Sequence, residues 1–530
     1  ELAGIRLGRH DLVLLYGEEA QEAFFRASDE QLDQAAAYPF MKPIFGAGVV
    51  FDAASPEQRK QAMKNQALQD TMMRGHAETI ASETERMIES WGASGEIDLL
   101  DFFAELTLYT SSACLVGKEF REELTPEYTR LFQELERGTD WLAYISPYLP
   151  LPSFRTRDRA RRRLVELIQG IIDSREREGR KPSDLVAVLT SIKNEDGTPR
   201  YNADIVTGMF IAMMFAGHHT TSGTAAWTLI ELLRNPGIMG DVVAELDTLF
   251  ADGREVSYQA LREIPELECS IKESLRLHPP LIMLSRIVQE PFKYKGWTVE
   301  KGTTLSVSPA VSNRMPEVFP DPDRFDPGRY KNNPSADRRV FAWLPFGGGR
   351  HRCVGAQFAI MQLKTIFSVL LRRYSFEMSQ PAASYRDAGS RMVVQLEQPC
   401  RVRYHRREAV AARATTSPNA TVAGDGAAGD ACPAASARTA SGACPASTAG
   451  TASAASTAAG ASAGRARIEV DLDLCQGHGV CVGEAPELFE VDVAERKVRL
   501  RTDRITAEQR DRAERAVKHC PTSALRLLDD

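Results

Sequence analysis

Cys353 is the residue with the clearest chemical potential, because it stands at the end of a glycine-rich loop. Residues 346–355 read FGGGRHRCVG, and an apolar helix pattern follows them. Backbone N–H groups of such a loop, the positive start of the following helix, and the flanking Arg350 and Arg352 all favour a thiolate over a thiol. A thiolate held in this way is a suitable axial ligand for haem iron. The alternative, a phosphate-binding loop, requires P-loop spacing and a Lys-Ser/Thr ending, which the segment lacks.

Three further cysteines lie near the C-terminus, at Cys475, Cys481 and Cys520, the last followed by Pro521. Their spacing resembles that of a small bacterial ferredoxin, whose four-iron cluster uses C-x2-C-x2-C and a remote C-P. His478 stands where the middle cysteine would be, so the three cysteines suit a 3Fe–4S cluster, which needs one ligand for each iron. Two alternatives stay open: a 4Fe–4S cluster with His478 as fourth ligand, and a zinc site made from the same residues.

The Cys353 loop fits the complete signature F-x-x-G-x-H/R-x-C-x-G of the cytochrome P450 haem-thiolate monooxygenases, and the chain resembles this family. Residues 273–276 read ESLR and supply the E-x-x-R pair of that family, with both charges on one face of a helix. The resemblance implies that Arg329 joins Glu273 and Arg276 in a buried ionic network. An E-x-x-R pair alone is common by chance, but this one lies about 80 residues before Cys353, as the family pattern requires.

Residues 216–221 read AGHHTT and fall in the middle of a long helix expected from Asp204 to the residue before Pro236. In most of the P450 superfamily this position reads A/G-G-x-D/E-T, in which an acid and a threonine pass protons to iron-bound dioxygen. Here His219 replaces the acid, and imidazole can relay protons as a carboxylate does. In isolation, both histidines would be ordinary polar-face residues. The resemblance implies catalytic roles for His219 and Thr220, and we assign none to His218.

Two segments narrow the resemblance: residues 215–223, FAGHHTTSG, and residues 37–46, AYPFMKPIFG. Both are similar to the sterol 14α-demethylases, and the similarity runs from the first residues to about Arg407. It implies that the propionates of haem b are held by Tyr38, Lys60, Arg286 and His351. It also implies a substrate cavity lined by Tyr38, Phe40, Met41, Phe45, Phe215, Ala216, Leu281 and Met283. An apolar, aromatic lining suits a flat sterol, although we expect roughly a third of this set to be ordinary core residues.

The reaction implied by this resemblance is removal of the 14α-methyl group of a lanosterol-type sterol in three successive monooxygenations. Each of them uses O2 and two electrons, and the carbon leaves as formate. Two alternatives remain: a P450 monooxygenase of another hydrophobic substrate, and a non-catalytic haem-thiolate sensor or electron carrier. The sequence has no Rossmann fingerprint and no flavin site. We therefore expect an external NAD(P)H-dependent ferredoxin reductase to supply electrons through the C-terminal module.

Composition divides the 530 residues into three parts. Residues 1–408 predict a mainly α-helical domain with a small β part, the P450 fold, including an apolar helix over 357–373 and strands that turn at Gly296. Residues 409–464 contain 23 Ala and no aromatic residue, Leu, Ile or Met, and so predict a disordered linker. As a flexible chain, this linker would have an r.m.s. end-to-end distance of about 40 Å. Residues 465–530 predict a small α+β ferredoxin-like domain.

Charge and cysteine content limit the remaining possibilities. A net charge of −7, from 65 basic and 72 acidic residues, excludes a typical nucleic-acid binder. Nine cysteines, an odd number, argue for a reducing compartment. We expect a monomeric, soluble protein of the bacterial cytoplasm, with peripheral membrane contact for sterol access and an N-terminal piece preceding Glu1. Residues 467–495 hold eight acidic residues and one basic residue. We expect them to dock on basic residues near the thiolate loop, such as Arg350, Arg352 and Lys364, the alternative being a plain solvated face.

Overall fold

The computed structural model describes most of the chain in two folded parts. Lys60, His478 and the Ala-rich segment 409–464 lie outside the described residues, and so does the side chain of Arg350. The described residues are 2–7, 10–49, 70–123, 126–136, 143, 146–180, 185–194, 196–332, 341–388, 393–408, 466–472, 475, 477, 479–492, 497–502, 504–520 and 524–529.

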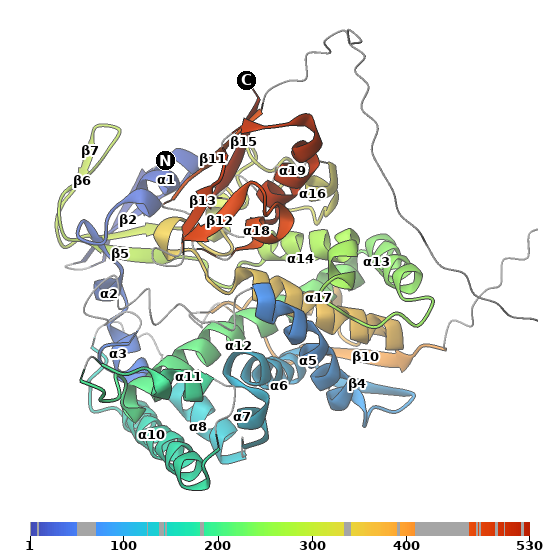
Figure 1. Cartoon of the computed structure of the whole chain (residues 1–530), viewed down its shortest axis with the longest axis horizontal. Helices are drawn as coiled ribbons and strands as arrows, with labels where there is room; N and C mark the ends of the chain where they lie inside the picture. Colours follow the sequence, from blue (N-terminus) through green and yellow to red (C-terminus); the bar gives the residue numbers. More distant parts are fainter. Residues whose placement is uncertain are drawn as a thin grey trace, which may run out of the picture.

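The longest helix, α12 (Ala203–Arg234), runs through the larger part, where Figure 1 shows it among the surrounding helices. Asn202 caps its first turn by accepting a hydrogen bond from the Ile205 N–H at 3.0 Å, and the helix ends before Asn235. The helix expected from Asp204 onward is therefore confirmed. Every residue from 221 to 232 is buried, whereas most of residues 212–220 keep accessible surface. The middle of α12 is thus its open part.

Shorter helices surround α12, with α6, α14 and α10 among its main contacts. The end of α6 widens into a π-helical turn, η4. The helices of the larger part are α1 (Glu18–Arg26), α2 (Gln34–Ala37), η1 (Pro39–Met41), α3 (Lys42–Phe45), α5 (Asp70–Ile88), α6 (Leu99–Ser111), η4 (Ser112–Val116), α7 (Lys118–Glu123), α8 (Pro126–Glu136), α10 (Pro152–Glu178), α11 (Leu185–Ser191), α13 (Pro236–Leu249), η5 (Ala260–Glu263), α14 (Pro265–Leu277), α15 (Pro309–Ser312), α16 (Gly328–Asn332), η7 (Gly349–His351), α17 (Ala356–Arg373) and η8 (Ala382–Ser384).

The β part of this domain is small. A five-stranded sheet has the order β1-β2-β8-β5-β3, in which only β2 and β8 are parallel. A second sheet has the order β4-β10-β9, and the hairpin β6–β7 turns at Gly296, which has a φ of +82°. The strands are β1 (Leu2–Leu7), β2 (His10–Leu15), β3 (Leu32–Asp33), β4 (Ser94–Asp98), β5 (Leu284–Val288), β6 (Phe292–Tyr294), β7 (Trp297–Val299), β8 (Thr304–Val307), β9 (Tyr374–Met378) and β10 (Arg401–Arg406).

Two hydrophobic cores meet along α12. One contains its C-terminal half together with residues of α5, α6, α14 and α17. The other contains its N-terminal half together with residues of α3, α8 and α10. The half-open middle of α12 therefore lies between two packed regions, which hold it in place from both ends. The expectation of a mainly helical domain with a small β part is confirmed.

The C-terminal module is a separate small α+β unit, as expected. Strands β14, β11 and β15 form an antiparallel sheet, β12 and β13 form a hairpin, and α18 packs on α19. Its own core includes Ile468, Leu488 and Phe489. The elements are β11 (Ala466–Val470), α18 (Val480–Glu484), β12 (Phe489–Asp492), β13 (Lys497–Leu500), β14 (Arg504–Ile505), η9 (Ala507–Gln509), α19 (Arg510–His519) and β15 (Leu525–Asp529).

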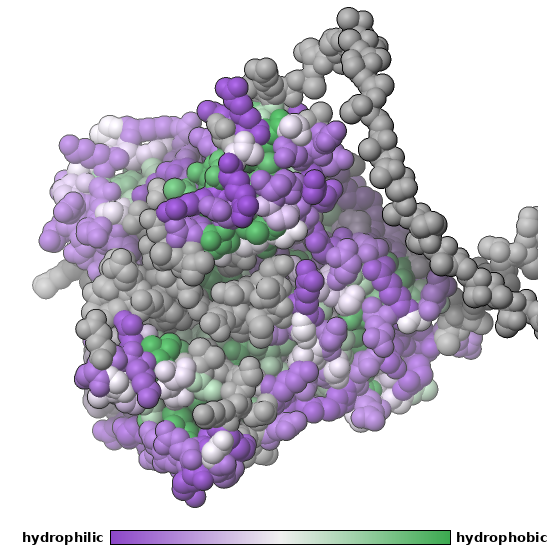
Figure 2. Space-filling view, in the orientation of Figure 1, coloured by the Kyte–Doolittle hydropathy of each residue, from purple (hydrophilic) through white to green (hydrophobic). Residues whose placement is uncertain are grey.

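One described stretch, Leu99–Val116, is long and apolar enough to cross a bilayer, but 78% of it is buried inside the helical domain. Such burial is typical of a core helix in a globular protein. Figure 2 shows mainly hydrophilic residues over the described part of one face, with small apolar areas between them.

Candidate haem-thiolate and cluster sites

The loop before Cys353 has a backbone that needs glycine. Gly347 and Gly349 adopt positive φ angles of +66° and +61°, and a Cβ on Gly349 would lie 2.3 Å from the carbonyl oxygen of Phe25. The Cys353 N–H donates to the Phe346 carbonyl at 2.9 Å, which closes the loop just before α17 begins at Ala356. The loop is therefore folded tightly on itself and packed against the end of α1.

Cys353 is exposed as a residue, although many protein atoms surround its sulfur. Burial among these atoms raises the pKa of the thiol, whereas the Gly355 N–H and the Arg352 charge lower it, and burial prevails. The sequence predicted these donors but not this net direction. Coordination to a metal cation deprotonates a thiol outright. An exposed cysteine with a backbone donor to its sulfur, on a loop made narrow by glycines, fits a thiolate ligand of haem iron.

A buried ionic network holds the region behind this loop. Arg276 binds Glu273 through two nitrogens at 2.8 and 2.9 Å, and both side chains are fully buried. Arg329 Nε donates to the same carboxylate at 3.0 Å. Arg276 also donates to the carbonyl of Asn313 at 2.9 Å, and Asn313 Oδ1 accepts the Leu344 N–H at 3.1 Å. The network thus connects, through Asn313, to the start of the thiolate loop.

The two neighbouring histidines of α12 lie in different environments. His218 is buried against Phe132, with its Nδ1 3.4 Å from the hydroxyl of Thr107. Burial, followed by the neighbouring His219, lowers the pKa of His218 to about 3, so its imidazole is neutral near pH 7. His219 is only partly buried, and its carbonyl accepts a hydrogen bond from Gln395 at 3.2 Å.

Thr220 and Gly217 complete this open turn of α12. The Thr220 hydroxyl donates to the Ala216 carbonyl at 2.7 Å. A Cβ on Gly217 would meet only Ser111 Oγ, at 3.4 Å, so the glycine leaves room beside the helix. His219 and Thr220 are therefore on the accessible part of α12, where a proton could reach or leave them, whereas His218 is not.

Two of the residues expected at the haem propionates are brought together. The Tyr38 hydroxyl accepts the Ser285 N–H at 3.0 Å, beside Arg286 in β5. Arg286 is buried, and its guanidinium donates to the Phe24 carbonyl at 3.1 Å and lies over the Phe24 ring. The third, His351, makes an Nε2 contact with Asp29 Oδ1 at 2.6 Å. Asp29 is a partner that the sequence analysis missed.

The expected cavity residues divide into two groups. The rings of Phe45 and Phe215 are 5.9 Å apart at right angles, and Met41 packs in the same cluster. Phe40 has no exposed surface and packs with Phe154 in a second small cluster, against which Tyr38 and Met41 also pack. It therefore has the environment of an ordinary core residue. Of the remaining members, Ala216 and Met283 are exposed and Leu281 is half-buried.

Arg161 of α10 positions the Phe45 segment, a contact that no local sequence pattern predicts. Its Nε and Nη2 donate to the carbonyls of Ile44 and Phe45 at 3.1 and 3.2 Å, and its Nη1 binds Asp204 at 2.6 Å. One guanidinium therefore fastens the end of α3 to the first turn of α12. The only available signal was one arginine among several in an arginine-rich helix, which is too weak to single it out.

In the C-terminal module, Cys475 and Cys481 are buried and Cys520 is half-buried. The Val498 N–H donates to the sulfur of Cys475 at 3.4 Å, and the Ala524 N–H to that of Cys520 at 3.3 Å. Burial, then the nearby sulfurs of the other two cysteines, raise the pKa of Cys481 to about 12. The three cysteines therefore lie in one cluster of the module core, close enough for their sulfurs to interact electrostatically. Backbone donors to sulfur are typical of iron–sulfur ligands. Within the described part of the chain no three His, Cys, Asp or Glu side chains converge on a single metal ion.

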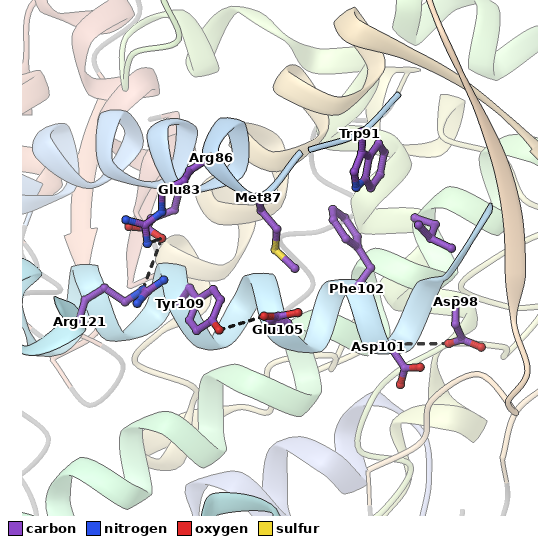
Figure 3. A pocket seen from close by; sticks show the side chains of 11 residues that line it. Glu83, Arg86, Met87, Trp91, Asp98, Asp101, Phe102, Glu105, Tyr109 and Arg121 are labelled. Atoms are coloured by element: carbon purple, nitrogen blue, oxygen red, sulfur yellow. Dashed lines mark hydrogen bonds and ion pairs between the residues drawn. The ribbon is translucent and has the colours of Figure 1, made fainter. Parts of the chain in front are cut away.

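A surface hollow of about 510 Å³ lies between α5 and α6, lined by Met87, Trp91 and Phe102 and by charged side chains. Figure 3 shows Glu83 directed to Arg121, an ion pair of 3.4 Å, and the Tyr109 hydroxyl directed to Glu105, a hydrogen bond of 2.9 Å. None of the expected site residues lines it. The hollow is therefore separate from the thiolate loop and from the open turn of α12.

Comparisons with known proteins agree with this geometry. The family profile described as Cytochrome P450 matches residues 1–403, and the profile described as 4Fe-4S single cluster domain matches residues 468–527. Sterol 14alpha-demethylase of Mycobacterium tuberculosis (strain ATCC 25618 / H37Rv) is 56% identical over 414 residues, which are 77% of this chain and 92% of that protein. Lanosterol 14-alpha demethylase of Bos taurus is 35% identical over 402 residues, 74% of this chain and 78% of that protein.

Among solved structures, retinoic acid-bound cyanobacterial CYP120A1 superposes with a TM-score of 0.67 at 21% identity, covering 77% of this chain and 92% of that one. This likeness confirms the expected fold of the larger domain. The family implies a haem, and the C-terminal profile implies an iron–sulfur cluster. With a profile matched over residues 1–403 and a 56% identical relative covered almost completely, the chain belongs to the cytochrome P450 family and resembles its sterol 14α-demethylases.

Proposed function

We propose that this chain is a sterol 14α-demethylase with its own electron-transfer module. It removes the 14α-methyl group of a lanosterol-type sterol by three successive O2-dependent monooxygenations, with electrons passed from the fused iron–sulfur module to the haem. The observation that carries the proposal is the 56% identity to a sterol 14alpha-demethylase over 414 residues. It is supported by the exposed Cys353 on its glycine loop and by the open His219–Thr220 turn of α12.

Cys353 would hold the haem iron, and Tyr38, Arg286, His351 and Lys60 would hold the propionates. When bound, the haem supplies the oxidising chemistry of each cycle, which consumes O2 and two electrons. The His351 imidazole is already held by Asp29, at 2.6 Å from Nε2. To bind a haem propionate, His351 would use its other ring nitrogen or exchange Asp29 for the propionate. Tyr38 and Arg286 lie beside each other, so a single carboxylate could accept hydrogen bonds from both.

The chain's other residues bind the substrate and handle protons. The apolar surfaces of Phe45, Phe215 and Met283 would receive the flat sterol and exclude water around it. His219 and Thr220, on the accessible turn of α12, would hold and pass the protons that the reaction consumes. His218 remains neutral and buried, so it supports the turn without exchanging protons near pH 7.

In the module, Cys475, Cys481 and Cys520 would hold a 3Fe–4S cluster, with one cysteine for each iron. A 4Fe–4S cluster with His478 as the fourth ligand is the alternative, and a zinc site is the weaker one. Because the sequence has no nucleotide-binding fingerprint, an external NAD(P)H-dependent ferredoxin reductase would reduce the cluster. We propose that the protein works as a monomer in the bacterial cytoplasm.

The decisive experiment reconstitutes the full chain with haem, cluster, ferredoxin reductase, NADPH and a 14α-methyl sterol. We expect formate release and a shift of the haem spectrum from low to high spin on sterol addition, with neither effect from a fatty acid. A spin shift with fatty acids but with no 14α-methyl sterol would indicate a monooxygenase of another substrate. Sterol binding without any turnover, although the haem is reduced, would indicate a sensor or electron carrier.

The cluster is tested separately by iron and sulfide analysis with electron paramagnetic resonance of the oxidised protein. Three non-haem irons per chain, in addition to the haem iron, and a signal of the oxidised cluster beside that of ferric haem are expected for a 3Fe–4S cluster. Four non-haem irons that fall to three in a His478→Ala variant would instead favour the histidine-ligated 4Fe–4S cluster. Stoichiometric zinc without sulfide would end both iron–sulfur assignments.

A further inference from the structure

Two ion pairs join the C-terminal module to the helical domain. Both terminal nitrogens of Arg26 lie 3.4 Å from Asp471 Oδ2, and Arg262 binds the carboxylate of Glu484. The four side chains are partly exposed, from 10% for Glu484 to 38% for Arg26. Figure 1 shows the module beside α1 and above α14, the helix that follows Arg262.

On the module side, both carboxylates belong to the segments that carry cluster cysteines. The backbone carbonyl of Asp471 accepts the Cys475 N–H at 3.0 Å. Glu484 is on α18, the same short helix as Cys481, and Arg515 of α19 also holds it at 3.4 Å. The surface that contacts the helical domain is therefore the surface nearest the cluster ligands.

In the helical domain, Arg26 is the last residue of α1, the helix that packs on the thiolate loop. The preceding residue, Phe25, lies against Gly348 and Gly349. The guanidinium of Arg26 is 5.6 Å from the ring of Phe341. Glu22, one turn earlier, holds Arg26 Nε at 2.8 Å and so leaves the two terminal nitrogens for Asp471. The module thus contacts the helical domain close to the loop that carries Cys353.

The second arginine lies on another element, which packs on the helix that follows the thiolate loop. Arg262 is in η5, which packs against α17, the helix that begins just after Cys353. The basic residues expected to receive the module are differently engaged. Lys364 is buried and binds Glu268 at 2.5 Å, and Arg352 is also buried.

We propose that Arg26 and Arg262 form the docking site that seats the cluster face of the module, through Asp471 and Glu484, beside the thiolate loop. The proposal rests on electron delivery by the fused module, as proposed above. With haem and cluster bound, the docked arrangement would let one electron pass from the reduced cluster, which is thereby oxidised, to the ferric haem, which becomes ferrous. The external reductase then restores the cluster electron from NAD(P)H.

Ion pairs between partly exposed side chains suit this exchange. The pairs are screened by salt, and the tether keeps the module at an effective concentration in the millimolar range if the linker is flexible. Strong affinity is therefore unnecessary. The same acidic surface has to leave the helical domain if the reductase is to reach the cluster, so a contact that opens readily allows both partners to use it in turn.

A first test detects the contact itself, independently of any activity. Carbodiimide joins a lysine amine to a carboxylate at short range, so we would treat the holo chain carrying Arg26→Lys or Arg262→Lys and map the products by mass spectrometry. Peptides linking residue 26 to Asp471 and residue 262 to Glu484 are expected, and they should decline at high salt. As a matched control, Arg254→Lys should link to Glu263 of its own domain, its partner at 2.7 Å. If the control links and neither module link appears, the docking site is wrong.

A second test measures transfer. In stopped-flow reduction of the full chain under CO, the double variant Arg26→Glu/Arg262→Glu should reduce its haem about tenfold more slowly than the unchanged chain at ~20 mM ionic strength. Adding Asp471→Arg and Glu484→Arg should restore most of the rate by exchanging the charges. The control Arg163→Glu, on the distant surface of α10, should leave it unchanged.

The outcomes of this second test separate the two proposals. An unchanged rate in the double variant, or no recovery on charge exchange, would contradict the docking site while electron delivery stands. If the cluster of the unchanged chain never reduces the haem, electron delivery itself is wrong, and the cross-linking result still decides whether the module docks there.

Discussion

The same chemical pair, an arginine with a carboxylate, is used in two opposite ways in this chain. In the interior, Arg276 donates two hydrogen bonds to the Glu273 carboxylate, at 2.8 and 2.9 Å, and neither side chain has exposed surface. Between the two folded parts, Arg26 reaches a single oxygen of Asp471 at 3.4 Å, and both side chains remain partly in solvent. The first pair belongs to the fold, and the second is a contact that can open and close.

The energy scale of the two pairs differs because of desolvation. Removing one partner of a buried pair leaves an uncompensated charge away from water and costs about 3–5 kcal/mol. An exposed pair contributes about 0.2–1 kcal/mol, and salt weakens it further. Burial and the number of hydrogen bonds, rather than residue type, therefore set the strength of each pair. Four substitutions test this rule inside the helical domain, from the largest effect to the smallest.

The largest effect is expected for Arg276→Ala. Among the described residues, it leaves the buried Glu273 carboxylate with Arg329 and Tyr330 as side-chain partners, and it removes the bond to the Asn313 carbonyl. We expect a loss of about 3–5 kcal/mol in the free energy of unfolding, with poor haem retention, because Asn313 also binds the start of the thiolate loop. Urea unfolding and the haem content of the purified chain measure both. A loss below about 1 kcal/mol would mean that burial does not govern the strength of this pair.

The buried His218 makes the stability of the helical domain depend on pH. Its pKa is about 3 in the folded state, against 6.5 ordinarily, so the unfolded chain takes up the proton first as the pH falls. Stability is therefore lost from about pH 6.5 downward, by about 2 kcal/mol at pH 5 from this group. His218→Asn should remove that part of the loss. Unfolding at pH 7 and pH 5 gives the comparison, and identical slopes for variant and unchanged chain would refute it.

An intermediate effect is expected for Arg161→Ala, because its side chain is mostly buried while its partner Asp204 is half exposed. The Arg161→Ala variant also loses the hydrogen bonds to the Ile44 and Phe45 carbonyls. We expect a loss of about 1–2 kcal/mol and a severalfold weaker sterol affinity in spectral titration, since Phe45 is released. Arg163→Ala, on the same helix and paired at the surface with Glu127, is the matched control and should change neither quantity.

The smallest effect is expected for Arg386→Gln, which removes an exposed pair with Glu397. The free energy of unfolding should change by less than about 0.5 kcal/mol, and haem content should stay the same. Thermal and urea unfolding in parallel would detect a larger loss. A change near that of Arg276→Ala would remove the distinction between the two kinds of pair.

The features that the sequence predicted correctly are those encoded by neighbouring residues. The extent of α12, the hairpin turn at Gly296 and the glycine loop before Cys353 each depend on local patterns, such as the Asn202 cap and the positive φ of glycine. The pairing of Arg161 with the Phe45 carbonyl spans 116 positions, and that of Arg26 with Asp471 spans 445. Such contacts depend on the tertiary arrangement, for which a single sequence gives no local signal.

The same distinction explains why particular side-chain expectations differed from the structure. Phe40 was expected at the substrate cavity because of its segment; in the structure it packs with Phe154 and has no exposed surface, and its cavity role stays a prediction. Lys364 was expected to be available at the surface, but it binds Glu268. Residue type indicated what each side chain could do, whereas its neighbours in space decided what it does. The roles of Tyr38, Arg286, His219 and Thr220 stay predictions until the tests above.

The hydroxyl of Thr220 has one further consequence. Its single proton is already given to the Ala216 carbonyl at 2.7 Å, so what it offers to the open side of α12 is a pair of acceptor sites. A water molecule or a hydroxyl group beside it would be oriented with its own hydrogen toward Thr220. The helix backbone thereby fixes the direction of hydrogen bonds at this hydroxyl. Thr220 accepts hydrogen bonds from groups on the open side of α12, and it can donate one to them only when its bond to the Ala216 carbonyl breaks.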